Sequence, residues 1–255
     1  MRLTGQVALI FGGSSGIGRA TALRLGREGA TVAVVASNDV AKANQVASEI
    51  VGEGGAAQGF VADVRNVSSI RHVVAEVEAT LGPIGIMVYS AGLYYPTRLG
   101  ELNEEDFDRM VDINLKGAFF AIDAVAEVMR PRRRGHIVSL ASVAAFRGSS
   151  SYPLYAATKA AIMMLTRSLV GSLAPHGIHI NAVAPGNTAT PLNENDRQGK
   201  GSAETLAAKA AQTPSGRVYS PPEEIAAAIY FLVSGEVNAM HGTTLLIDEG
   251  LWAGR

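Results

Sequence analysis

Apolar runs of strand length alternate with longer segments of helical period along the whole chain. The predicted strands cover residues 7–11, 31–36, 57–62, 84–89, 135–140, 178–183 and 243–247. The predicted helices cover residues 17–27, 40–51, 67–81, 104–129, 152–173, 203–211 and 223–233. The strands are apolar on both faces, which is typical of a parallel sheet covered by helices on both sides. The pattern predicts one α/β domain over residues 1–255, with a doubly wound, seven-stranded parallel sheet.

One segment, residues 187–220, breaks this alternation. It is polar and rich in Gly, Asn, Thr and Pro, and its one weak helical pattern lies at 203–211. Loops of this length inside a compact domain are often functional. We expect this segment to form a lid over a binding site.

Composition and charge exclude several classes of protein. The 255 residues carry 22 basic and 23 acidic side chains, and a net charge of −1 offers no footprint for nucleic acid. The absence of cysteine excludes disulfides, zinc ribbons and thiol catalysis, and the five histidines are scattered, so we expect no metal site. No apolar run reaches the roughly 18 residues of a membrane span, and the start shows no signal-peptide pattern. We expect a soluble, cytoplasmic protein.

Glycines cluster between the first predicted strand and the first predicted helix. Gly12, Gly16 and Gly18 follow a Gly-x3-Gly-x-Gly spacing. Glycine lets the backbone turn sharply and approach a ligand, and the free N–H groups of a helix N-terminus attract phosphate. The place after the first strand of a doubly wound sheet favours a dinucleotide pyrophosphate site, and a tight turn without a ligand is the alternative.

A second group of candidate residues lies around Tyr155. Lys159 stands four residues later, so both side chains share one face of a predicted helix, and an ammonium group beside a phenol lowers the phenol pKa from about 10. Such a tyrosine serves as a general acid or base near neutral pH, and a solvated helix face is the alternative. Ser142 follows the fifth predicted strand, where its hydroxyl can bond a substrate oxygen. Asn114 is polar in an apolar helix and is either functional or a buried amide bonded to the backbone.

In this order and spacing, the motifs resemble the short-chain dehydrogenase/reductase family over essentially the whole chain. The matching segments are Gly12-x3-Gly16-Ile17-Gly18, Asp63-Val64, Ala91-Gly92, Asn114, Ser142, Tyr155-x3-Lys159 and residues 181–186. The resemblance implies a Rossmann fold and an NAD(P)-dependent oxidoreductase that acts on an alcohol or a ketone. It also implies a homotetramer built through the helices at 119–129 and 155–169.

The resemblance further implies a role for each matching residue. Tyr155 would be the acid/base, and Lys159 would lower its pKa and bind the nicotinamide ribose. Ser142 would hold the substrate oxygen, and Asn114 would position a water of a proton relay. The cofactor would contact Gly12, Ser14, Ser15, Gly16, Ile17, Gly18, Ser37, Asn38, Asp63, Val64, Ala91, Gly92, Tyr155, Lys159, Pro185, Gly186, Thr188 and Thr190. The substrate would contact Tyr94, Ser142, Tyr152, Tyr155 and Leu192, with Tyr95, Phe146 and Leu154 as further candidates for the pocket wall.

Three positions depart from the family pattern. Phe11 replaces the usual Thr, Tyr89-Ser90 replaces the usual Asn-Asn, and Thr188 replaces an aliphatic residue. A non-catalytic sensor or scaffold that binds the dinucleotide therefore stays open as an alternative. A 3-oxoacyl-(acyl-carrier) reductase is the alternative enzyme, and it needs a basic docking patch, for which Arg98 or residues 130–134 are the candidates.

The end of the second predicted strand bears on the choice of dinucleotide. Family members that prefer NAD usually carry Asp where this chain has Ala36, and that carboxylate repels a 2′-phosphate. Ser37 and Asn38 can donate hydrogen bonds to phosphate, but the places where NADP-preferring members add Arg hold Ser15 and Ser37. We expect a mild preference for NADP over NAD.

Overall fold

Seven parallel strands form one sheet at the centre of the molecule. The computed structural model describes residues 2–199 and 201–254. The strands are β1 Val7–Phe11, β2 Thr31–Ala36, β3 Ala56–Val61, β4 Ile84–Tyr89, β5 Gly135–Leu140, β6 Ile178–Pro185 and β7 Thr244–Ile247. Their order in the sheet is β3-β2-β1-β4-β5-β6-β7. The predicted doubly wound sheet is confirmed, and β6 extends two residues beyond its predicted end.

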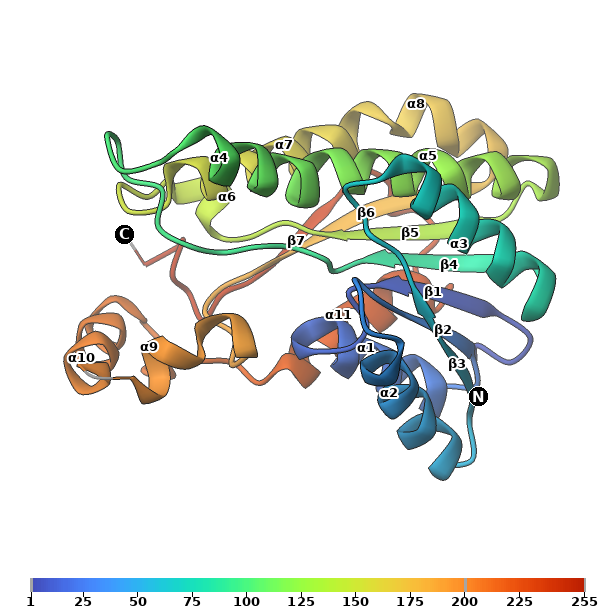
Figure 1. The fold of residues 1–255 in the computed structure, drawn as a ribbon, viewed down its shortest axis with the longest axis horizontal. Coiled ribbons are helices and arrows are strands. Elements are labelled where there is room, and N and C mark those ends of the chain that lie inside the picture. The colour runs from blue at the N-terminus through green and yellow to red at the C-terminus, as the bar shows by residue number, and fades with distance from the viewer. Residues whose placement is uncertain (1, 200, 255) are drawn as a thin grey trace.

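Helices cover both faces of this sheet (Figure 1). One face carries α3 Val67–Thr80, α5 Gly117–Met129 and α7 Pro153–Ser168. The other face carries α1 Gly16–Arg27, α2 Val40–Gly52 and α11 Pro222–Val233. Both faces of the five inner strands are therefore buried, which explains why their sequences are continuously apolar. The edge strand β3 alternates with exposed positions, and the edge strand β7 is only partly buried.

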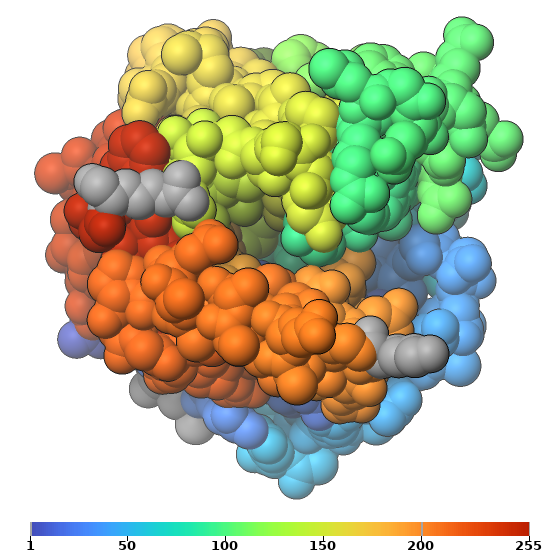
Figure 2. All heavy atoms as spheres, turned by 90° about the vertical axis from the view of Figure 1, so that its left-hand side faces the viewer, coloured from blue at the N-terminus to red at the C-terminus, as the bar shows by residue number. Residues whose placement is uncertain are grey.

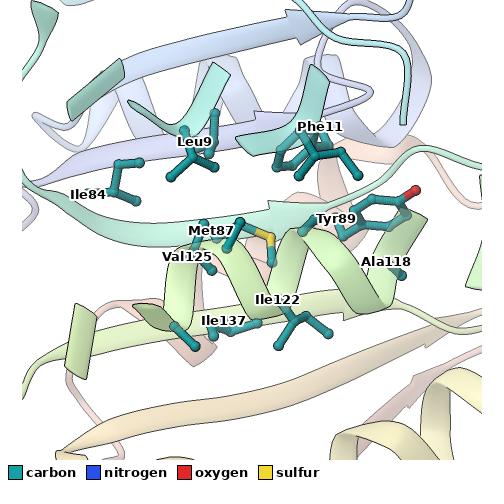
Figure 3. Close-up of a cluster of buried hydrophobic side chains, with 14 of the residues drawn as sticks. Leu9, Phe11, Ile84, Met87, Tyr89, Ala118, Ile122, Val125 and Ile137 are labelled. Atoms are coloured by element: carbon teal, nitrogen blue, oxygen red, sulfur yellow. The ribbon is translucent and has the colours of Figure 1, made fainter. Parts of the chain in front are cut away.

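The packing of α5 on the sheet shows how one layer of the core is built (Figure 3). Ile122 and Val125 of α5 face Leu9 and Met87 of the neighbouring strands β1 and β4, and all four side chains are buried. Burial of side chains of this size stabilises the fold by about 1.5–3 kcal/mol each. This layer holds the carboxyl ends of β1, β4 and β5 in fixed relative positions.

The chain changes direction between β1 and β4. It runs outward from β1 through β2 to β3, and then returns to place β4 on the other side of β1. In doubly wound sheets, a crevice opens outside the carboxyl ends of the strands at such a point. Four shorter helices gather around this edge or near it: α4 Glu104–Val111, α6 Ala144–Arg147, α9 Glu194–Gln198 and α10 Ser202–Gln212. A fifth, α8 Val170–Leu173, follows α7 and lies at the opposite edge, just before β6 begins.

The helix expected at residues 104–129 contains an unexpected π-helical stretch. Residues Asp112–Lys116 form this π-helix between α4 and α5. π-helical turns insert one extra residue into the ladder and occur frequently at functional sites. Asn114 lies at the centre of the stretch, so its side chain is aimed by this irregularity.

The lid segment contains more structure than the sequence indicates. The expected helix is α10, and α9 precedes it without a clear apolar pattern. The two ends of the segment are joined to each other, because Ala189 N–H donates to the Ser220 carbonyl at 3.0 Å and Ser220 N–H donates to the Asn187 carbonyl at 2.9 Å. We call this joined pair of ends, residues 187–189 with Ser220, the lid stem. None of the helices in the described part of the chain is long and apolar enough to cross a membrane.

Candidate active site

A cavity of about 670 Å³ opens at the carboxyl edge of the sheet. Its size is in the range of small-molecule and cofactor sites. Figure 2 views this edge, with the lid segment in orange lying below the segments around 145–155 and 95–110. The predicted site residues that line the cavity are Gly12, Ser14, Ser15, Gly16, Ile17, Ser37, Asn38, Asp63, Val64, Ala91, Gly92, Tyr94, Ser142, Tyr152, Tyr155, Lys159, Pro185, Gly186, Thr188, Thr190 and Leu192. One cavity therefore brings together residues from nearly the whole chain.

The glycine loop forms one wall and fits a pyrophosphate. Gly12 has φ +73°, and a Cβ there would lie 2.7 Å from the Ala91 nitrogen. A Cβ at Gly18 would overlap the Gly12 carbonyl oxygen, so Gly18 lets α1 pack on the loop and does not itself line the cavity. The side chain of Ser15, at the N-cap of α1, makes no cap hydrogen bond. The N–H groups of the first helical turn are thus directed to the cavity for an anion.

The far end of the cavity is formed by the ends of β2 and β3. Ala36, Ser37 and Asn38 line it, and the Asp39 side chain accepts from Ala41 N–H at 2.9 Å, which makes it the N-cap of α2. Asp39 is thus engaged in capping its own helix. At Ala36 no carboxylate occupies the place where one would repel a 2′-phosphate.

Asp63 lies at the same end and is paired with a cation. Its carboxylate accepts from the Arg65 guanidinium at 2.7 Å, and this hydrogen bond lowers the Asp63 pKa. Asp63 therefore stays ionised at neutral pH and can accept hydrogen bonds from a ligand at this end of the cavity.

The candidate catalytic side chains converge in the middle of the cavity. Ser142 follows β5, and Tyr155 lies in the first turn of α7. The Ser142 hydroxyl lies close enough to the Tyr155 hydroxyl to interact with it. Burial raises the Tyr155 pKa, and the Ser142 hydroxyl opposes this rise by stabilising the phenolate.

Lys159 is buried one turn further along α7. Its ammonium group donates to the Leu140 carbonyl at 2.7 Å and lies 5.8 Å from the centroid of the Tyr155 ring. Burial lowers the Lys159 pKa to about 8. The expected lowering of the Tyr155 pKa below 10 is not found here, because desolvation of the phenol dominates and the ammonium group is directed at a backbone carbonyl.

Asn114 lies behind this cavity wall and does not line it. Its Oδ1 accepts from Leu93 N–H at 2.7 Å, and its Nδ2 donates to the Leu93 carbonyl at 3.0 Å and to Thr158 Oγ1 at 3.2 Å. A Cβ at Gly92 would lie 3.4 Å from Asn114 Oδ1 and 3.6 Å from Lys159 Nζ. Asn114 therefore joins the loop after β4 to the helix that carries Tyr155 and Lys159.

The first two departures from the family pattern occupy neighbouring places. Phe11 and Tyr89 are partners in the register of β1 and β4, and their rings pack at 5.8 Å between centroids. The Tyr89 hydroxyl donates to the Ile113 carbonyl at 2.6 Å, within the π-helical stretch that carries Asn114. An aromatic pair thus links the two strands, and the Tyr89 hydroxyl is bonded to the residue that precedes Asn114.

Several sequence expectations about the pocket are wrong. Tyr95, Phe146 and Leu154 do not line the cavity. The Tyr95 hydroxyl donates to the Asp106 carbonyl of α4 at 2.6 Å, and Phe146 packs against Trp252. The lining residues that sequence reasoning missed include Arg147, Ser149, Lys209, Gln212 and Leu251. They lie outside recognisable motifs, and only the folding of α6, the lid and the C-terminal segment brings them together.

The basic run at residues 130–134 cannot serve the mouth of this cavity. It precedes β5, so it lies at the amino edge of the sheet, whereas Ser142 follows β5 at the carboxyl edge. Six residues of extended strand span about 20 Å. Arg132 is also paired with Glu78 at 2.7 Å. Arg98, in the loop after β4, is the remaining basic candidate, and it is paired with Glu101.

Comparison with known proteins identifies the family. The family model described as short chain dehydrogenase matches residues 6–201. This chain belongs to the short-chain dehydrogenase family. It is an NAD(P)-dependent oxidoreductase that interconverts an alcohol and a carbonyl, and its cavity binds a nicotinamide dinucleotide.

Relatives within this family have diverse activities. The chain is 36% identical to a 3-oxoacyl-(acyl-carrier-protein) reductase of Thermotoga maritima, over 98% of this chain and 99% of the relative. It is 36% identical to a galactitol 2-dehydrogenase of Agrobacterium fabrum, over 99% of both chains. A gluconate 5-dehydrogenase of Burkholderia cenocepacia, solved in complex with NADP and tartrate, superposes with a TM-score of 0.93 at 34% identity, over 99% of this chain and 97% of that one.

Proposed function

We propose that this short-chain dehydrogenase uses Tyr155 as the proton donor and acceptor for an alcohol/ketone substrate. The observation that carries the proposal is the approach of the Ser142 and Tyr155 hydroxyl groups inside one cavity, one helical turn from the buried Lys159. The dinucleotide supplies or accepts the hydride. Ser142 and Tyr155 direct two hydroxyl groups at one point, where they hold a carbonyl oxygen and stabilise the negative charge that develops on it.

The protonation states favour donation by Tyr155 at neutral pH. Burial raises the Tyr155 pKa, so the hydroxyl keeps its proton until the substrate oxygen becomes basic enough to take it. Lys159, with a pKa of about 8, is mostly charged at pH 7 and stabilises the phenolate that is left. Asn114 would hold the loop after β4 beside Lys159, where a water can return the proton.

Replacing the phenol tests this assignment. Tyr155→Phe should lower kcat by about 10²–10⁴-fold, because only the proton-transfer group is lost. Dinucleotide affinity, measured by fluorescence titration, should stay near wild type. Unchanged turnover of a panel of ketones and alcohols would remove Tyr155 from the mechanism. A wild-type protein that binds the dinucleotide and turns over no substrate would establish the non-catalytic alternative.

We also propose that NADP is preferred mildly over NAD. Ala36 leaves room beside Ser37 and Asn38 for a 2′-phosphate, and these polar groups line the cavity. Solved relatives hold NADP or NADPH. Ala36→Asp should shift the kcat/KM ratio toward NAD by about 30-fold, which corresponds to a repulsion of about 2 kcal/mol between the carboxylate and the 2′-phosphate. Ala36→Ser is the matched control, and an equal shift in both variants would contradict this explanation.

Reduction of an acyl chain on a carrier protein is the second candidate. It rests on the Thermotoga maritima relative and on Arg98 at the carboxyl edge. Measuring kcat/KM for a 3-oxoacyl group on the carrier protein and for the same group as a simple thioester separates the two candidates. A higher kcat/KM for the carrier-bound substrate requires that the carrier protein docks on the enzyme.

Two further features belong to the proposal. The segment at 187–220 would act as a lid that closes over dinucleotide and substrate and excludes water. The chain would assemble as a homotetramer through the outer faces of α5 and α7. Phe119 on α5 is 44% exposed and Met164 on α7 is 57% exposed, and both helices cover the same face of the sheet.

A further inference from the structure

The part of the cavity beyond Ser142 and Tyr155 is available for a substrate. The glycine loop and the ends of β2 and β3 account for the dinucleotide end. The other end is lined by Tyr94, Arg147, Gly148, Ser149, Tyr152, Leu192, Lys209, Gln212 and Leu251. Tyr94 and Tyr152 stack here at 4.4 Å between ring centroids. The chemistry of this lining therefore indicates which substrates fit.

Arg147 is the exceptional side chain in this lining. It ends α6, five residues after Ser142, and is partly buried. Four arginines are partly buried within residues 2–199 and 201–254, and three of these have partners. Arg19 pairs with Glu49, Arg24 pairs with Glu28, and Arg197 donates to Asn193 and Thr190. Among these four described arginines, Arg147 alone makes no ion pair and no side-chain hydrogen bond. A guanidinium withdrawn from water without an acceptor is poised to bind an anion.

The other charges around the cavity do not neutralise Arg147. The lining of the described chain contains one acidic residue, Asp63, and Arg65 pairs with it at the dinucleotide end. Lys159 donates to the Leu140 carbonyl, and Lys209 is bonded to Asp196 at 2.8 Å and to the Tyr219 hydroxyl at 2.7 Å. Arg109 also lines the cavity, but it is exposed to solvent and lies over the Tyr95 ring. Among the described lining residues, Arg147 is therefore the one partly buried cation with neither an acidic partner nor a side-chain hydrogen bond.

The dinucleotide phosphates do not account for this charge. The glycine loop follows β1, and Arg147 follows β5, with β4 between these two strands. Two strand spacings separate them by about 10 Å. Arg147 instead ends the helix that follows Ser142, the residue that we propose holds the substrate oxygen, and both residues line the same cavity.

We propose that the substrate is a hydroxy acid and its oxo-acid counterpart, with Arg147 binding the carboxylate. The inference rests on the proposed alcohol/ketone chemistry at Tyr155. The carboxylate is unchanged in the reaction, since hydride and proton add only to the ketone carbon and oxygen. Binding at Arg147 orients the chain so that this ketone oxygen meets Ser142 and Tyr155.

Paired substrates test the proposal. Oxo acids of about three to six carbons are compared with their methyl esters, which keep the ketone and remove the charge. Wild type should favour at least one acid over its ester. Arg147→Gln should lower kcat/KM for that acid by about 10- to 100-fold, mainly through KM, and change the ester by less than about threefold. Arg147→Lys should recover part of the loss, because it keeps the charge without the bidentate geometry.

Arg98→Gln is the matched control. Arg98 is an exposed cation at the same edge of the sheet that does not line the cavity, so its loss should leave the acid-to-ester ratio unchanged. Equal losses for acid and ester in Arg147→Gln, or no preference for any acid in wild type, would overturn the assignment of Arg147. Failure to turn over any ketone or alcohol would instead overturn the proposed function.

Discussion

The Tyr89 hydroxyl offers a direct test of how the π-helical stretch supports catalysis. Tyr89→Phe removes one oxygen that is buried and that donates to the Ile113 carbonyl at 2.6 Å. The aromatic contact with Phe11 stays in place. A buried hydrogen bond contributes about 1 kcal/mol, and an acceptor left without its donor adds to the loss, so the free energy of unfolding should fall by about 1–2 kcal/mol.

The effect on turnover follows from the position of Asn114. The Ile113 carbonyl is in the same π-helical stretch, one residue before the side chain that holds Leu93 and Thr158. A loosened stretch shifts Asn114 relative to Lys159, and shifts of about 1 Å near reacting groups cost up to 100-fold in rate. We expect kcat to fall about tenfold in Tyr89→Phe, with little change in dinucleotide affinity.

Two comparisons make this prediction sharp. Tyr95→Phe removes a hydroxyl with the same 2.6 Å bond to a helix carbonyl, but that carbonyl belongs to Asp106 in α4, outside the π-helical stretch. It should cost some stability and leave kcat near wild type. Urea unfolding and steady-state kinetics are measured on both variants and on Asn114→Ala. If Tyr89 acts through Asn114, the double variant should be no slower than Asn114→Ala alone. Full activity in Tyr89→Phe, or multiplied losses in the double variant, would refute the reasoning.

Two predictions concern pH and motion. His136 stacks on His179, and burial lowers its pKa from 6.5 to about 4, so the unfolded chain takes up a proton first as the pH falls. The free energy of unfolding should therefore decrease from pH 6.5 to 4 by up to about 1.4 kcal/mol per pH unit. In urea titrations, His136→Phe should flatten this pH dependence. His72→Gln, a change at an exposed position, should leave the pH dependence as it is in wild type. In hydrogen-exchange mass spectrometry, residues 190–219 should gain protection when NADP(H) and substrate are added, whereas the lid stem should change little; equal protection with and without ligands would count against a closing lid.

The sheet was predictable because its signal is local. β1, β2, β4 and β5 end at the predicted residues, since each is a short apolar run bounded by polar or glycine-rich turns. The glycine loop and the Tyr155–Lys159 pair were predictable for a similar reason, because both depend on fixed spacings within a few consecutive residues. Residues that act through short-range patterns are visible in a single sequence.

The remaining features depend on contacts between distant segments. The π-helical stretch arises where the Asn114 side chain binds the backbone of Leu93, 21 residues earlier, and periodicity carries no sign of such a bond. The direction of the Tyr155 pKa shift depends on how deeply α7 is buried and on where the Lys159 ammonium points. Arg147 is one of many arginines in the sequence, and only the tertiary structure shows that it lacks a partner.

The lid stem has a consequence for how this fold diversifies. The segment leaves the sheet after β6 and returns before α11, and both ends meet at one point through the pairing of Thr188 with Ser220. The segment between these ends can be lengthened, shortened or replaced without moving any strand, because the lid stem already fixes the distance between its two ends. We therefore expect that the segment can be exchanged while the sheet and the proposed proton-transfer groups stay unchanged. Grafting residues 190–219 between family members that share the stem should transfer substrate preference while the proton-transfer groups stay in place.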